Sequence, residues 1–199
     1  MHTSRYKTAG WLSIFVAIIF VPKFVFSLIL GIIAHEFHSP GLYLLDALLT
    51  IPLTAAFVYL LITIRFLLNE RYDFHDVDKL ITINYWCLII TGFISIVDDI
   101  LKTVGISGQH LTTPDIILLV TFFSVFYVMG VVSIIYGIRL LRLKGDLFGM
   151  LKVYVYTTIA GGVCLVSIIL LPLSLIVAVA TYILEGMIFL RAAEDEEFV

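Results

Sequence analysis

Charged side chains are scarce in this sequence. Asp, Glu, Lys and Arg make up 14% of its 199 residues, whereas soluble proteins average about 25%. Hydrophobic residues make up 61%, more than a soluble protein of this length can bury. The scarcity of charge excludes a soluble domain and predicts an integral membrane protein whose first partner is the lipid bilayer.

Positive charge and cysteine are also scarce. The formal net charge is −3, and no stripe of basic residues exists, so a nucleic-acid partner is not expected. The two cysteines, Cys87 and Cys164, both fall inside apolar runs, whereas a disulfide framework would place them in loops. They are expected to be small buried residues.

Complete catalytic and cofactor motifs are missing. No nucleophile elbow, phosphate-binding loop or dinucleotide-binding fingerprint occurs, so neither an enzyme nor a cofactor is expected. The nearest approach is His35-Glu36-Phe37-His38, in which the second histidine comes one residue too early for the zinc motif H-E-x-x-H. His35 and His38 remain weak candidate metal ligands, which would need further ligands from the same side of the membrane. A metal-dependent membrane enzyme is therefore a minor alternative.

Long apolar runs are abundant. A transmembrane helix needs about 20 apolar residues to cross a hydrocarbon core of about 30 Å. The run after Arg5 and Lys7 is too long for a signal peptide and is expected to be retained as a span. The segments that meet the length requirement singly are Gly10–Ala34, Leu42–Leu68, Leu80–Leu101 and Asp115–Leu141.

The last apolar run, Val153–Leu190, is too long for one crossing, since as a helix it would extend about 57 Å. Pro172 lies at its middle and predicts a break there, which gives the spans Val153–Leu171 and Leu173–Leu190. The sequence therefore predicts an all-α membrane protein with six transmembrane helices in one compact bundle, residues 1–199. The alternative has five spans, with Lys144–Tyr156 as an interfacial helix.

The lysines and arginines fix the expected orientation, because basic loops stay cytoplasmic. With the N-terminus inside, the loops of the first four spans leave only Lys102 outside. Both termini are therefore expected to be cytoplasmic, in a plasma membrane or a bacterial inner membrane. The acidic tail Ala192–Val199 is expected to be a disordered, solubilising end. The basic residues placed inside are Arg5, Lys7, Arg65, Arg71, Lys79, Arg139, Arg142, Lys144 and Lys152.

Lys23 is the clearest polar residue within a span, since it follows Pro22 between two apolar halves. An ionisable residue in the hydrocarbon core is costly, so it is expected to face protein or water and to have a partner. Its candidate partners lie toward the outer ends of their spans and are Asp46, Asp98 and Asp99. Asp46 is the first choice, because consecutive helices usually lie side by side. The pair would serve either as a structural ion pair or in transport.

Glu185 lies in the inner half of the last span, at about the depth of Arg139. This placement predicts an ion pair between the two helices. The glycines at Gly161-Gly162 and Gly186 are expected to let helices approach closely.

The missing catalytic motifs, the short loops and the small bundle together predict a function. We expect a non-catalytic membrane subunit, sensor or scaffold that acts in a homo-oligomer or hetero-complex. The alternative is an ion- or proton-coupled small-solute transporter or channel that uses Lys23 and the outer aspartates.

Overall fold

The computed structural model describes residues 2–33, 40–105 and 113–197. These residues form six α-helices and two short 3₁₀ turns, and no strand occurs among them. The helices are α1 (His2–Ile33), α2 (Pro40–Tyr72), α3 (Asp78–Thr103), α4 (Thr113–Leu140), α5 (Leu151–Val166) and α6 (Leu171–Glu197). The turn η1 (Leu147–Gly149) precedes α5, and η2 (Ile168–Leu170) precedes α6. The expected all-helical bundle of six helices is confirmed.

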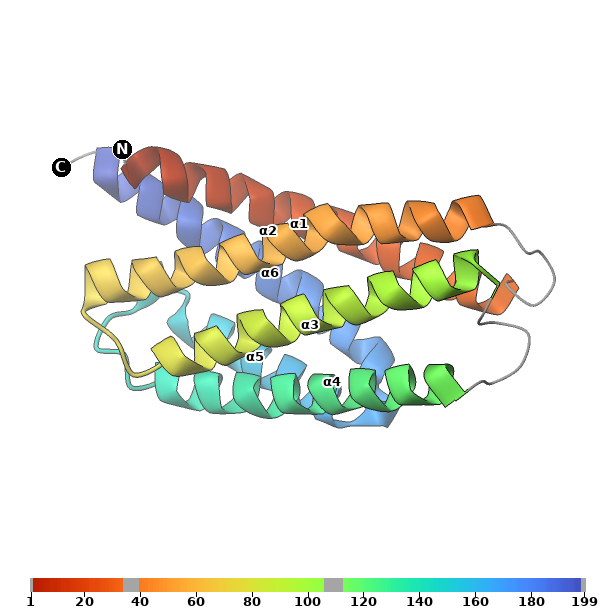
Figure 1. Cartoon of the computed structure of the whole chain (residues 1–199). Coiled ribbons are helices and arrows are strands. Elements are labelled where there is room, and N and C mark those ends of the chain that lie inside the picture. Colours follow the sequence, from red (N-terminus) through yellow and green to blue (C-terminus); the bar gives the residue numbers. More distant parts are fainter. Residues whose placement is uncertain (1, 34–39, 106–112, 198–199) are drawn as a thin grey trace.

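The helices form a closed ring in which each one packs against its neighbours in the sequence and α1 packs against α6. Successive helices run in opposite directions, so α1 begins and α6 ends at the same end of the bundle (Figure 1). Short connections between apolar helices favour this antiparallel order. We name this end the terminal end and the opposite one the far end.

Aromatic side chains from α1, α2 and α6 pack against one another. The Phe57 ring of α2 lies 5.7 Å from the Phe20 ring of α1 and 5.0 Å from the Tyr182 ring of α6, between centroids. Such pairs bury large apolar surfaces and stabilise the packing of the helices that carry them. Leu60 and Ile64 continue the buried core on α2.

Glycines set the closest helix crossings. A Cβ atom added to Gly130 of α4 would lie 2.8 Å from the Gly162 carbonyl oxygen of α5, and one added to Gly162 would lie 2.7 Å from the Gly130 carbonyl oxygen. Gly10 of α1 and Gly186 of α6 face each other in the same reciprocal way. The expectation is confirmed for Gly162 and Gly186, because a Cβ there would meet the backbone of the neighbouring helix. For Gly161 it is wrong, since an added Cβ would meet only the Val177 side chain at 3.5 Å.

The break in the last apolar run differs from the prediction. Helix α5 ends at Val166, the turn spans residues 167–170, and Pro172 lies in the first turn of α6, where its missing N–H costs nothing. The break at Pro172 was therefore wrongly placed. The five other helices are long and apolar enough to cross a membrane, whereas α5 has only 16 residues.

The alternative is borne out in part: five helices are long enough to cross a membrane, but no continuous helix forms over Lys144–Tyr156. Residues 144–150 form a turn, and α5 begins at Leu151 and packs along α4. Leu147 and Phe148 adopt positive φ angles of 42° and 60° in this turn, which a continuous helix cannot contain.

The acidic tail is more ordered than expected. Helix α6 continues to Glu197, and Ala192 and Ala193 are buried. The Arg71 guanidinium of α2 donates to the Ala192 carbonyl oxygen at 3.1 Å and lies 3.4 Å from the Asp195 carboxylate. The prediction of a disordered tail is therefore wrong for residues 192–197, because Arg71 attaches this last part of α6 to the bundle.

Candidate functional site

An ion pair joins α1 and α2 in the half of the bundle nearer the far end. The Lys23 Nζ atom lies 3.5 Å from Asp46 Oδ2, with 16% of the lysine and 6% of the aspartate side chain exposed. This is the pairing that the sequence favoured. It forms because a charge within the membrane is far less costly beside an opposite charge than alone.

Ser27 completes this ion pair. Its hydroxyl lies 2.9 and 3.0 Å from the two Asp46 carboxylate oxygens and donates to that group. Ser27 comes one helical turn after Lys23, so both side chains face α2. Ser27 was not among the predicted residues, although its i+4 spacing from Lys23 was the available signal.

Two aspartates next to each other on α3 extend the charged cluster and differ in their partners. Asp98 pairs with Lys102 one turn later, and these side chains are 31% and 25% exposed. Asp99 is only 7% exposed, and its Oδ2 atom has no hydrogen-bond partner among the described residues. The charges that act on Asp99 include those of Asp46 and Lys23, so all five groups form one electrostatic cluster.

The cluster has one carboxyl group more than it has ammonium groups. Lys23 forms an ion pair with Asp46, and Lys102 forms one with Asp98. Asp99 therefore has no ammonium partner of its own in the described part of the chain. A buried carboxylate without a partner is costly, so this group is chemically suited to take up a proton.

The metal hypothesis finds no support in the described ranges. His35 and His38 lie outside them. Among residues 2–33, 40–105 and 113–197, no three His, Cys, Asp or Glu side chains gather in a way that could hold a metal ion.

Glu185 of α6 forms a second buried polar site, between α6 and α5. Its side chain is 3% exposed and accepts a hydrogen bond from the Tyr154 hydroxyl, 2.8 Å from Oε1. The Tyr136 hydroxyl of α4 lies 3.5 Å from that of Tyr154. The other carboxyl oxygen, Oε2, has no hydrogen-bond partner in the part of the chain that the structure describes.

The predicted ion pair between Glu185 and Arg139 is wrong. Arg139 instead donates from Nη1 to the Asp76 carbonyl oxygen at 3.0 Å, in the connection between α2 and α3. Arg139 lies in the last turn of α4, so its long side chain extends toward water rather than into the core. Tyr154 was missed, because its position beside Glu185 depends on the packing of α5 against α6.

No family model matches this chain, and neither does any curated protein or solved structure.

Proposed function

We propose that this chain is a non-catalytic membrane subunit or scaffold that acts in an assembly with another chain. One observation carries the proposal, namely the exposed apolar turn between α5 and α6. With 16 residues, α5 extends about 24 Å, which is less than a hydrocarbon core of about 30 Å. The turn at residues 167–170 then lies at membrane depth, and Figure 1 draws it short of the far ends of α1–α4.

The backbone of this turn supports the need for a protein partner. Ile169 is 89% exposed, and residues 168–170 form a 3₁₀ turn, in which the Leu170 N–H donates to the Ser167 carbonyl oxygen at 3.0 Å, in place of a continuous α-helix. A break between two helices leaves fewer backbone hydrogen bonds than a continuous α-helix, so at membrane depth it is favoured under protein cover or beside water. The apolar side chains Ile169, Leu170 and Ile176 favour protein cover over water.

The half of α4 nearer the far end continues this uncovered surface. The last residues of α5 lie beside Gly130, since an added Cβ there would meet the Val166 side chain at 2.8 Å. Helix α4 extends beyond that point toward the far end without α5 alongside, and Ile117, Val120 and Tyr127 are exposed. We name the surface formed by these residues together with Ile169 and Ile176 the α4–turn surface.

Cysteine crosslinking tests the assembly. In a background with Cys87 and Cys164 replaced by alanine, Ile169→Cys in native membranes should give a crosslinked species larger than the monomer when a bismaleimide is added. Phe93→Cys, at an exposed position on α3, is the matched control and should give much less. Monomer alone from Ile169→Cys, or equal yields from both positions, would count against the α4–turn surface as an interface.

We also propose that the terminal end is cytoplasmic. The terminal end gathers the basic last turns of α2 and α4 and the basic start of α1, with Arg5 and Lys7, which supports this orientation under the positive-inside rule. Reporter fusions at the N- and C-termini should both be active as cytoplasmic domains. Reporters on opposite sides of the membrane would contradict six crossings, and two external reporters would reverse the orientation.

A second function, proton-coupled transport of a small solute, is supported by Asp99. A buried carboxyl without an ammonium partner is a frequent element of proton pathways in membranes. Transport also needs a water path through the bundle, and the rings of Phe20, Phe57 and Tyr182 pack closely against one another between α1, α2 and α6. This packing is the reason why the subunit is the first proposal.

A further inference from the structure

Four exposed side chains form a stripe along the half of α4 nearer the far end. Ile117, Val120, Ser124 and Tyr127 follow one another at intervals of three, four and three residues, which is the spacing of a helix face that packs against another helix. Ile117, Val120 and Tyr127 are 60%, 59% and 55% exposed, so the bundle leaves this face largely uncovered. We name these four residues the α4 seam.

The α4 seam carries two hydroxyl groups to the middle of the membrane. Arg139 lies in the last turn of α4, where a basic side chain reaches the membrane surface. Tyr127 comes 12 residues earlier, which is about 18 Å along the helix, and half of a hydrocarbon core measures about 15 Å. Tyr127 therefore lies near the middle of the core, and Ser124 lies about 4.5 Å farther along.

These two hydroxyl groups have complementary needs. The Ser124 hydroxyl donates to the Val120 carbonyl oxygen of its own helix at 2.7 Å, which leaves its oxygen able to accept a hydrogen bond. The Tyr127 hydroxyl makes no hydrogen bond within the ranges that the structure describes, and a hydrocarbon core provides no water for it. Tyr127 therefore needs an acceptor, and Ser124 offers one.

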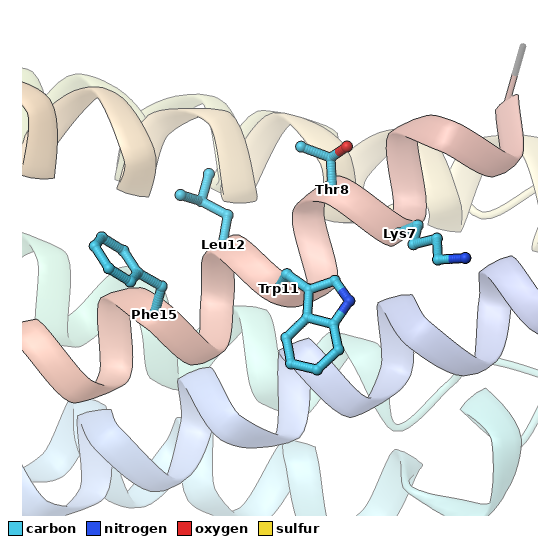
Figure 2. A pocket seen from close by; sticks show the side chains of 5 residues that line it. All are labelled: Lys7, Thr8, Trp11, Leu12 and Phe15. Atoms are coloured by element: carbon cyan, nitrogen blue, oxygen red, sulfur yellow. The ribbon is translucent and has the colours of Figure 1, made fainter.

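The other helices expose serine and threonine hydroxyl groups only near their ends. On α1, Figure 2 shows Trp11 and Phe15 along an open, shallow groove, with Lys7 and Thr8 toward the start of the helix. Lipid is sufficient cover for apolar faces of this kind, whereas hydroxyl groups in the middle of a span favour contact with another helix. Among the described residues, the exposed serines and threonines are Thr8, Thr113, Thr121 and Ser124.

A second copy of the chain provides the acceptor at the required depth. Copies that insert by the same charge rule have the same orientation, so two α4 helices that meet along their seams are parallel, with equal residues at equal depth. Helical side chains lean toward the N-terminal end of their helix. The Tyr127 side chain of one copy therefore extends toward the depth of Ser124 in the other, and two-fold symmetry forms this contact twice.

We propose that the partner at the α4–turn surface is a second copy of this chain, with α4 packed against α4 along the α4 seam. Each Tyr127 hydroxyl donates to the Ser124 Oγ atom of the other copy. Ile117 and Val120 continue the contact toward the far end. This inference rests on the proposed assembly at the α4–turn surface and names its partner.

Disulfide formation tests the identity of the partner. Two versions of the protein, each with its own epitope tag and with Cys87 and Cys164 replaced by alanine, are produced together in one membrane. In Ser124→Cys, mild oxidation should join the two versions into a dimer that carries both tags. Leu119→Cys should give much less, because Leu119 is also exposed on α4 but points about 140° away from Ser124.

Energy transfer between two labelled versions in lipid vesicles tests the hydroxyl groups. In Tyr127→Phe, the dissociation constant of the dimer should rise about eightfold, which corresponds to two hydrogen bonds of about 0.6 kcal/mol each. Ser124→Ala should give the same rise, and both changes together should give no more, since they remove the same two bonds. Thr121→Val removes an exposed hydroxyl of α4 outside the seam and should leave the dissociation constant almost unchanged.

Three results would overturn this inference. Crosslinked products of Ser124→Cys and Ile169→Cys that carry one tag and a different protein would assign the surface to another chain and leave the proposed assembly intact. Equal dissociation constants for Tyr127→Phe and the unchanged protein would remove the hydroxyl contact on which the seam depends. Monomer alone from both Ser124→Cys and Ile169→Cys would reject the assembly itself together with the dimer.

Discussion

Replacing Lys23 or Asp46 alone by alanine should lower the free energy of unfolding by about 3–5 kcal/mol, whereas replacing both should restore part of the loss. Each single change leaves one buried charge without its partner, because the ammonium and the carboxylate lie 3.5 Å apart with little exposure. The double change removes both charges, so the desolvation cost is removed with them. Unfolding by detergent titration, followed by circular dichroism, measures all three variants.

The second ion pair of the cluster provides a matched control. Lys102 and Asp98 lie one turn apart on the same helix and are 25% and 31% exposed. Pairs one turn apart on a helix contribute about 0.3–0.5 kcal/mol at the surface, and this pair is more exposed than the Lys23–Asp46 pair, so Lys102→Ala should have a smaller effect than Lys23→Ala. Strictly additive losses for Lys23 and Asp46 would show that their contact contributes nothing, and equal losses at the two lysines would show that burial does not matter here.

The pairing of Lys23 was predictable because it depended on chain order. Asp46 lies in the early part of the next helix, and a short connection brings that helix beside the first one. The contrast between Asp98 and Asp99 was not predictable. Adjacent residues on a helix point about 100° apart, so one faces Lys102 and the other is buried, and their depth in the membrane says nothing about that direction.

The direction in which a side chain points around its helix also explains why the prediction for Glu185 was wrong. Its depth matched that of Arg139, but α6 turns the carboxyl toward Tyr154 of α5. The helical register of α5 depends on where the last apolar run breaks. Pro172 was compatible with a break at the proline itself or with a helix beginning just before it, and the sequence did not distinguish these two positions.

The crossing of α4 and α5 should be the packing contact most sensitive to a single added methyl group. Gly162→Ala is expected to lower the free energy of unfolding by about 1–3 kcal/mol, as overpacking usually does. The added Cβ would lie 2.7 Å from the Gly130 carbonyl oxygen and 3.0 Å from the Ile134 nitrogen. Both are backbone atoms, so the helices have to move apart.

The neighbouring glycine is the matched control and should change stability in the opposite direction. A Cβ at Gly161 meets only the Val177 side chain, at an ordinary 3.5 Å. Gly161→Ala should therefore stabilise the protein by up to about 1 kcal/mol, because alanine loses less conformational freedom in a helix than glycine does. Detergent titration of both variants measures the difference.

Combining Gly130→Ala with Gly162→Ala tests whether both single losses of stability come from the same crossing of α4 and α5. Both methyl groups would separate the same two backbones, so the combined loss should be smaller than the sum of the single losses. Fully additive losses would indicate two independent strains. Equal effects of Gly161→Ala and Gly162→Ala would contradict the close approach of α4 and α5, because the two residues share one helix and differ in what their added Cβ atoms meet.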